Sequence, residues 1–239
     1  MKLAILGATG DSGRRLVRAA LADGHEVTAI VRDAAKAAAL AAPRLTIRQV
    51  AFSDHAALVA ALRGHDAVIN AAGYLRDGPA FVALVQAVIR AAAEALGPGG
   101  RFWLFGGAGV LDVPGKSITS LELPGIPKIS EAHRTNWNAV KATDLDWSML
   151  CPGPMVEAPN GEASRGLVVT ADTWPVALPG FTNFLPRPAL SLAFIQAVPR
   201  LRISYEDAAR AILDNLGKNG PFSKKRVGVA LADGKARAG

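Results

Sequence analysis

Short apolar segments alternate with helical patterns along the first two-thirds of the chain. The apolar segments are five or six residues long, as expected for buried strands, and lie at 2–6, 26–31, 45–50, 66–70, 101–105 and 146–151. Apolar residues at helical spacing separate them, over 11–23, 34–42, 55–63, 78–96 and 130–143. This alternation is typical of the α/β class, in which helices cover both faces of a parallel sheet.

The last third of the chain has a less regular pattern. Residues 155–200 are rich in Pro, Gly, Asn and Thr and carry several aromatic residues, so we interpret them as an ordered cover over a substrate. A helix over 205–216 with Ser204 as its N-cap and a strand over 225–231 follow, and 232–239 form a frayed tail. We therefore divide one structural domain into a binding core, 1–154, and a substrate-covering segment with a final helix and strand, 155–239.

Composition limits the classes of protein to which the chain can belong. Hydrophobic residues make up 50% of its 239 residues and charged residues 20%, which excludes a disordered chain. Its only cysteine, Cys151, cannot form an internal disulfide. No apolar run approaches the length of a membrane span, and no targeting leader precedes the first strand. We expect a cytoplasmic protein, a monomer or homodimer with no membrane partner.

The formal net charge of +7 raises the question of nucleic-acid binding. Basic residues are scattered along the predicted helices, and the only dense cluster is at 224–226. No zinc-ligand set or RNA-binding strand motif accompanies them. The charge favours a basic surface that suits small anionic ligands over specific nucleic-acid binding, and we expect no metal site.

A glycine-rich turn follows the first predicted strand and opens the first helix. Its glycines have the spacing G-x-x-G-x-x-G, which suits a tight turn, close approach of a pyrophosphate, and close packing of the helix on the sheet. The pyrophosphate would lie at the positive end of the helix dipole. The pattern predicts a Rossmann-type, doubly wound sheet and cofactor contacts from Gly7, Thr9, Gly10, Asp11, Ser12 and Gly13.

The residues at the end of the second predicted strand distinguish NAD from NADP. A carboxylate there binds the adenosine ribose, whereas an arginine neutralises a 2′-phosphate. The chain has Arg32 at this position, followed by Asp33, and Arg14 or Arg15 is close enough in principle to assist. We predict NADP(H) as the cofactor.

Two further strand ends supply candidate cofactor contacts. Asp54 follows the third strand, where it could accept from the adenine amino group, serve as N-cap of the helix at 55–63, or do both. The fourth strand ends in small residues, as needed where a chain passes beside a bound ribose. The contacts expected there are Ala71, Ala72 and Gly73.

Together these features resemble the short-chain dehydrogenase/reductase superfamily, in particular its atypical branch. That branch includes NmrA-like regulators, isoflavone-reductase-like proteins and flavin reductases of the biliverdin reductase B type. The segments that carry the resemblance cover nearly the whole chain: 7–13, 32, 54, 70–73, 145–147, 152–154, 203–207 and 225–229.

The chain departs from the superfamily at the catalytic residues that the resemblance implies. These are a serine after the fifth strand and a Tyr-x-x-x-Lys pair in the next helix, yet 106–109 contain no serine, and neither tyrosine lies in 130–143. Trp137 and Lys141 have the right mutual spacing, but Lys141 lies only 11 residues before Pro152. Atypical members place this lysine about 19 residues before the proline. That position is His133, with Ile129 in place of the tyrosine.

Several residues therefore become candidates near the nicotinamide. His133 could bond the ribose, as the lysine would, or move a proton near neutral pH; the alternative is a surface histidine. Tyr74 follows the fourth strand and either overlooks the cofactor or is an exposed loop residue. Pro152 and Gly153 are expected to form a wall beside the carboxamide, with Met155 over the substrate.

Three functions are compatible with these residues. We favour an NADPH-dependent reductase of a small planar acceptor, such as a flavin, quinone or enone, because such acceptors take hydride without an elaborate protein acid. Trp174, Phe181 and Phe184 are candidates to stack on the acceptor, or else form the floor of the cover. The second function is a non-catalytic NADP(H) sensor of the NmrA type, and the third a sugar-nucleotide epimerase.

Overall fold

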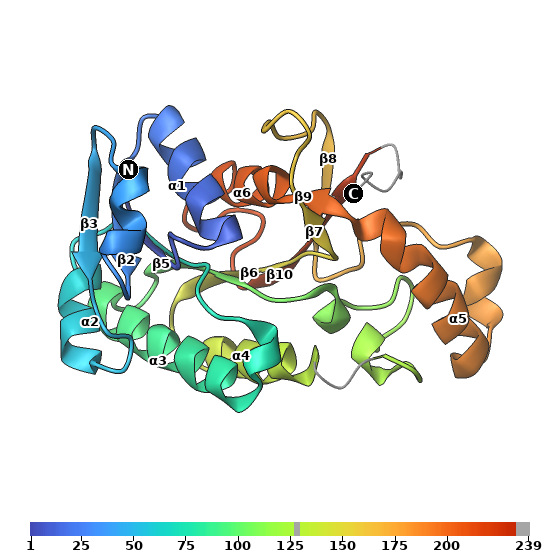
Figure 1. Ribbon diagram of the computed structural model, residues 1–239. Helices are drawn as coiled ribbons and strands as arrows, with labels where there is room; N and C mark the ends of the chain where they lie inside the picture. Colours follow the sequence, from blue (N-terminus) through green and yellow to red (C-terminus); the bar gives the residue numbers. More distant parts are fainter. Residues whose placement is uncertain (127–129, 233–239) are drawn as a thin grey trace.

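An eight-stranded sheet runs through the computed structural model, which describes residues 1–126 and 130–232 (Figure 1). The strand order is β3-β2-β1-β4-β5-β6-β10-β8, and neighbouring strands are parallel except β8, which is antiparallel to β10. The strands of this sheet are β1 (Lys2–Leu6), β2 (Glu26–Val31), β3 (Leu45–Gln49), β4 (Ala67–Asn70), β5 (Arg101–Phe105), β6 (Asp146–Cys151), β8 (Leu167–Ala171) and β10 (Lys225–Leu231). This arrangement confirms the predicted doubly wound α/β fold of the Rossmann type.

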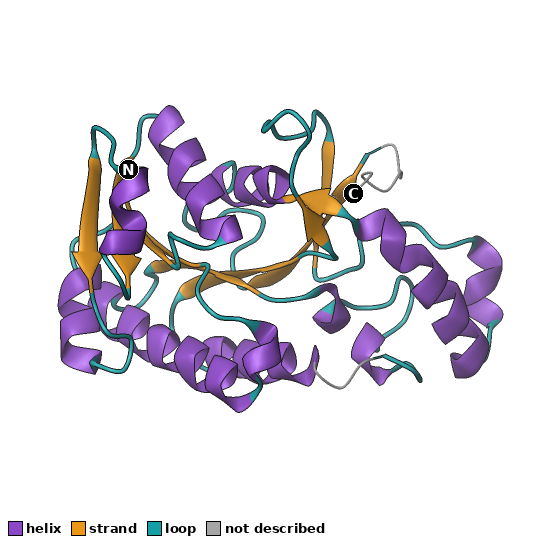
Figure 2. Cartoon of the chain, in the orientation of Figure 1, coloured by secondary structure: helices purple, strands orange, loops and turns teal. Residues whose placement is uncertain are grey.

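Helices cover both faces of the sheet, as Figure 2 shows. One face carries α1 (Asp11–Ala22) and α6 (Tyr205–Leu213), and the other carries α2 (His55–Leu62), α3 (Pro79–Leu96) and α4 (Glu131–Lys141). Each face has its own apolar core, because strands covered on both sides present apolar side chains to each of them.

A smaller third core lies beside the end of the sheet that carries β10. It packs α5 (Arg187–Ala197) against the loops around Val113 and Leu123, with Trp174 and Phe194 at its centre. Nearby, β7 (Met155–Val156) pairs in parallel with β9 (Ile203–Ser204). Short 3-10 helices complete the fold: η1 (Ala35–Leu40), η2 (Leu75–Asp77), η3 (Ala108–Val110), η4 (Ser120–Glu122), η6 (Gly180–Phe184) and η7 (Val198–Leu201).

Local sequence explains where two of the helices begin. Asp54 accepts a hydrogen bond from the backbone N–H of Ala57 at 3.0 Å and so caps α2. Ser204 and Asp207 form a reciprocal capping box at the start of α6, which confirms Ser204 as an N-cap. Both caps satisfy N–H groups that would otherwise lack a partner.

The prediction of an irregular segment over 155–200 is wrong in two places. β8 lies inside it and forms the edge of the main sheet, and α5 follows. Prolines flank α5, and apolar residues cover its whole circumference, so the helical period was hidden in the sequence. The alanine-rich stretch at 34–42 is helical as predicted, but as the 3-10 helix η1. Of the expected tail, 233–239 lie outside the described residues.

α3 meets the length and mean-hydropathy criteria of a membrane span, although 33% of its residues are buried inside the structure. Gln86, Arg90 and Glu94 interrupt its apolar residues, so it is not the uninterrupted apolar run that the sequence was searched for. One side of it packs into the core against α2 and α4, and its six buried residues include Phe81, Val85 and Val88. α3 therefore covers one face of the sheet.

Candidate functional site

A cavity of about 710 Å³ lies at the carboxyl ends of β1, β2 and β4. The strand order reverses between β1 and β4, and crevices at such a reversal are where ligands bind in open α/β sheets. Its walls come from the segments that follow these strands and β3: Gly7, Thr9, Gly10, Ile30, Val31, Arg32, Asp33, Lys36, Phe52, Ala71, Ala72, Gly73, Tyr74, Asp77 and Leu84.

The glycine turn between β1 and α1 is packed too tightly for side chains at two positions. A Cβ at Gly13 would lie 2.0 Å from the carbonyl oxygen of Gly7, and a Cβ at Gly7 would lie 2.6 Å from the backbone of Ala71. Gly7 also has φ +75°, a conformation that favours glycine. The predicted role of Gly13 in helix packing therefore has a direct geometric basis.

The N-terminus of α1 is free to bind an anion. Gly10 is its N-cap, and no side chain caps the first turn, so N–H groups of that turn have no intrahelical partner. Gly7, Thr9 and Gly10 line the cavity beside this terminus. A pyrophosphate would accept from these N–H groups and gain from the helix dipole, so the turn fits a dinucleotide.

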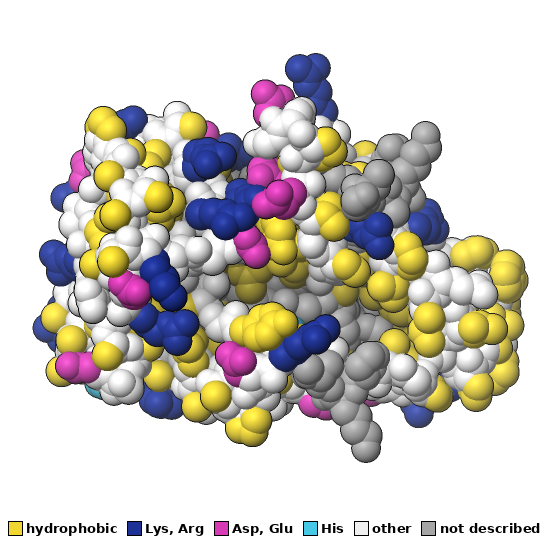
Figure 3. Space-filling view, viewed as in Figure 1, with side chains coloured by type: hydrophobic (Ala, Val, Ile, Leu, Met, Phe, Trp, Pro, Cys, Tyr) yellow, Lys and Arg dark blue, Asp and Glu magenta, His cyan; other side chains and the backbone are white. Residues whose placement is uncertain are grey.

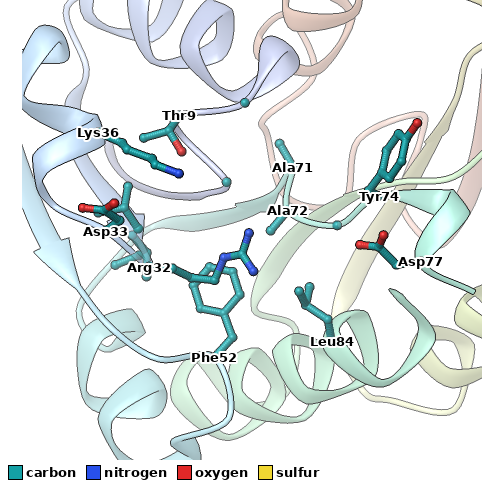
Figure 4. Close-up of a pocket in the computed structure, with 15 residues that line it drawn as sticks. Thr9, Arg32, Asp33, Lys36, Phe52, Ala71, Ala72, Tyr74, Asp77 and Leu84 are labelled. Atoms are coloured by element: carbon teal, nitrogen blue, oxygen red, sulfur yellow. The ribbon is translucent and has the colours of Figure 1, made fainter. Parts of the chain in front are cut away.

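Two cationic side chains line the cavity next to the carboxyl end of β2. Arg32 follows β2, and Lys36 lies one turn later in η1; both are exposed. Their charged ends point into the cavity, whereas the carboxylate of Asp33 points away (Figure 4). Asp33 accepts from the backbone N–H of Ala35 at 3.0 Å and so helps to start η1. The charged groups directed into this end of the cavity are therefore those of Arg32 and Lys36, although Asp33 also lines it.

Phe52 supplies an apolar wall that sequence reasoning missed. It follows β3, is buried, and lies below Arg32 in Figure 4. Asp54, two residues later, caps α2 and is not among the lining residues. Lys36, Asp77 and Leu84 were also missed; the spacing of Lys36, four residues after Arg32, was the one available signal.

The end of β4 forms the opposite wall. Ala71, Ala72 and Gly73 line the cavity as predicted, and Gly73 has φ +115° and lies directly on the ring of Phe81. Tyr74 lines the same wall and is 59% exposed, so its ring is available to a ligand.

His133 lies behind this wall and is not among the residues lining the cavity. Its ring meets Phe81 edge-on at 5.6 Å and lies against Gly107, where a Cβ would come within 2.9 Å of Nε2. It is 8% exposed, and burial lowers its pKa to about 4. The imidazole is therefore neutral at pH 7, which does not fit a proton shuttle near neutral pH, and it is not a surface histidine.

The inward face of α4 carries polar atoms with no partner among the described residues. They are Nδ1 of His133, both amide atoms of Asn136 and Nε1 of Trp137. Trp137 lies between Lys141, 4.4 Å from its ring centre, and Arg226, 4.2 Å away. Lys141 thus stacks on a tryptophan and does not line the cavity, and Ile129 lies outside the described residues.

Other predicted contacts lie outside the cavity lining. Asp11, Ser12, Pro152 and Gly153 are not among the lining residues. Asp11 forms an ion pair with Arg14 at 2.7 Å. The fold places Gly153 against Leu201, where a Cβ would lie 2.4 Å from the leucine Cβ.

The two arginines of α1 are directed away from Arg32. Arg14 and Arg15 both pair with Glu157, and Arg15 also pairs with Glu206 at 3.1 Å. The suggestion that they assist Arg32 is therefore wrong: Lys36 is the second cation of the cavity. These pairs instead join α1 to the segment that follows β7.

Comparison with known families supports the dinucleotide interpretation of this cavity. The family model described as NAD(P)H-binding matches residues 7–173, from the glycine turn to the segment after β8. The chain belongs to the NAD(P)H-binding family. The expected membership of an NAD(P)-binding family is thereby confirmed, and the findings support a nicotinamide dinucleotide as the cofactor.

Three relatives of this NAD(P)H-binding protein are informative. YwnB of Bacillus subtilis, which has no assigned activity, is 26% identical and covers 90% of this chain and 92% of its own. A candidate NADH-flavin reductase from Streptococcus pneumoniae has a TM-score of 0.71 at 25% identity, covering 97% and 99% of the two chains. Quinone oxidoreductase 2 of Escherichia coli is 44% identical over 64 residues, 26% of this chain and 22% of its own.

The aromatic residues expected to stack on a substrate lie elsewhere in this NAD(P)H-binding protein. Trp174 is buried and packs on Phe194 at 4.1 Å within the third core, so its role as a stacking residue is wrong. Phe181 and Phe184 are 65% and 90% exposed and do not line the cavity. Met155 is half-buried in β7 and does not line it either.

Proposed function

We propose that this protein is an NADPH-dependent reductase of a small planar acceptor of the flavin, quinone or enone type. One observation carries the proposal: the protein combines a cavity suited to a nicotinamide dinucleotide with a helix α4 whose described residues contain no Tyr-Lys pair. Relatives named for flavin and quinone reduction agree with this acceptor class.

Arg32 and Lys36 support NADPH as the preferred cofactor. Both cations face the place of the adenosine ribose, where they would bind a 2′-phosphate that NADH lacks. The N-terminus of α1 would hold the pyrophosphate, and Phe52 would contact the adenine end.

The residues of the chain act mainly by positioning. NADPH, when bound, supplies a hydride, which is two electrons and one proton. A quinone that accepts it becomes a hydroquinone anion and takes its second proton from solvent, so the protein need not supply an acid. The exposed ring of Tyr74 can stack on the acceptor at the cavity mouth, and small residues at 71–73 leave room beside it.

A redox sensor is the second candidate, and one observation favours it. His133, at the position where the resemblance places the catalytic lysine, is buried, neutral and separated from Gly73 by Phe81. A sensor needs no group that moves a proton. It must, however, bind oxidised and reduced cofactor with different affinity, because equal affinity shifts no equilibrium.

The deciding experiment measures NADPH oxidation by the purified protein with a flavin, a quinone or an enone, with NADH in parallel. Steady turnover of one class, faster with NADPH, supports the reductase. Tyr74→Phe should retain turnover because solvent provides the proton, whereas Tyr74→Ala should raise KM; Tyr205→Phe, which alters the other tyrosine, is the control. Cofactor binding without turnover of any class would refute the reductase and favour the sensor.

As part of the same proposal, we place the protein in the cytoplasm as a monomer or homodimer that acts on a small molecule and not on a specific nucleic acid. Cys151, the chain's only cysteine, is buried and unpaired, which agrees with a reducing compartment.

A further inference from the structure

The charged side chains that line the cavity are divided between its two ends. Arg32 and Lys36 lie beside the carboxyl end of β2, and Figure 3 shows basic side chains on this side of the molecule. Asp77, in η2, lines the opposite wall, and its carboxylate points into the cavity, whereas that of Asp33 points away (Figure 4). The cavity therefore has a positive end and a negative end.

Hydrogen bonds of η2 hold Asp77 on the same wall as Tyr74. The backbone N–H of Asp77 donates to the carbonyl oxygen of Tyr74 at 2.9 Å, and that of Gly78 donates to the carbonyl oxygen of Leu75 at 3.2 Å. Gly78, with φ +56°, ends this turn and is the N-cap of α3. The carboxylate and the exposed tyrosine ring thus belong to one short, hydrogen-bonded segment.

The carboxylate of Asp77 is not neutralised by a neighbouring side chain. Within 1–126 and 130–232 it forms neither an ion pair nor a hydrogen bond, and Asp77 is exposed. Arg76, the adjacent residue, is exposed as well but is not among the residues that line the cavity. A charge without a counter-ion acts on whatever binds beside it, so Asp77 disfavours an anion at this end and leaves an uncharged ligand unaffected.

The negative end is also where an acceptor would meet the nicotinamide. With the 2′-phosphate at Arg32 and Lys36 and the pyrophosphate at the N-terminus of α1, the nicotinamide half of NADPH extends away from β2. Bound NADPH brings its own phosphates to the two cations and so offsets their charge. The lining charge that an incoming acceptor meets is then that of Asp77.

We propose that Asp77 selects acceptors that carry no anionic group. The substrates are then uncharged planar compounds, such as riboflavin or an unsubstituted quinone, and not their phosphorylated or sulfonated forms. This inference rests on the proposed reductase function and narrows its acceptor class. Asp77 takes no part in hydride transfer; it sets specificity through its charge. Because the carboxylate is exposed and acts partly through water, the discrimination should be about threefold and should weaken in salt.

The test compares riboflavin with FMN, which differs from it only by a phosphate group. Quenching of flavin fluorescence measures the affinity of the full-length protein, saturated with NADP⁺, for each flavin without any turnover. Wild type should bind riboflavin about threefold more tightly than FMN, and this preference should disappear in roughly 1 M salt. Asp77→Asn, which removes the charge at nearly constant size, should bring the two affinities close together. The control, Asp144→Asn, makes the same charge change at an exposed residue before the amino end of β6 and should keep the wild-type ratio.

Several results would overturn the proposal. They are equal affinities in wild type, a wild-type ratio that salt does not change, a ratio that Asp77→Asn leaves unaltered, and an equal change in the Asp144 control. If neither flavin binds, a naphthoquinone and its sulfonate replace them, and absence of binding or of a preference for the uncharged quinone would overturn it as well. Failure of the proposed function has a different signature: the ratio of affinities shifts as expected, but no acceptor accelerates NADPH oxidation.

Discussion

The cations at Arg32 and Lys36 determine, by our reasoning, which nicotinamide cofactor the protein prefers. Both side chains are exposed and point into the cavity where the 2′-phosphate of NADPH would lie. A hydrogen bond to a charged group contributes about 1.5–3 kcal/mol, and solvent exposure places these two near the lower limit. Arg32→Ala should thus weaken NADPH binding about tenfold. Because the two cations would share one phosphate, the double variant with Lys36→Ala should lose roughly 30-fold, less than the roughly 100-fold expected from full additivity.

Fluorescence titration with NADPH and NADH measures both affinities for each variant. NADH lacks the phosphate, so its affinity should stay within about twofold of wild type in all of them. Arg63→Ala removes a positive charge outside the cavity, where Arg63 pairs with Glu94 at 3.6 Å, and controls for the change in net charge. An unchanged ratio of NADPH to NADH affinity in the double variant would refute the reasoning, as would an equal loss for both cofactors.

Three further predictions concern stability and reactivity. His133 binds its proton less readily in the folded state, with a pKa of about 4 against 6.5, so its protonation favours unfolding as pH falls through that interval. Between pH 7 and pH 4 the free energy of unfolding should therefore fall by about 3 kcal/mol more in wild type than in His133→Leu. Arg226→Met removes a buried guanidinium that binds Asp112 and Asp172 and should cost about 1.5–3 kcal/mol in urea unfolding, whereas Arg210→Met, at a partly exposed arginine, should cost less than about 1 kcal/mol. Burial raises the pKa of the Cys151 thiol to about 12, so a thiol reagent should label it only after unfolding.

Each of these predictions has a result that contradicts it. Parallel pH profiles for wild type and His133→Leu would show that the imidazole is not buried neutral. Equal losses in the Arg226 and Arg210 variants would show that burial of the first pair has no effect on its strength. Rapid labelling of Cys151 in the folded protein would show that β6 opens to solvent.

The sequence predicted those parts of the fold and site that depend on local pattern. Strands buried on both faces are predominantly apolar, so β1, β2, β5, β6 and β10 were predicted with their observed bounds. The glycine turn and Arg32 were found for a similar reason, because their roles follow from position next to a strand end.

Features that depend on tertiary contacts were not predictable from pattern. His133 was expected near the cofactor by spacing, but Phe81, from another helix, lies between it and the cavity wall at Gly73. Trp174 was assigned a role from its residue type, but packing within the third core buries it. Lys36 lines the cavity from the alanine-rich segment, which forms a 3-10 helix that the sequence did not distinguish from an α-helix.

The position of β10 has a consequence for how the chain is made. This strand, Lys225–Leu231, is inserted between β6 and β8 near the end of the sequence, and its Arg226 binds Asp112 and Asp172. During synthesis, β6 therefore has an open edge until residues 225–231 have left the ribosome. Unpaired edges of this kind are sites of aggregation. Truncated chains that end before 225 should accumulate as insoluble protein, and the nascent chain is a natural client for chaperones.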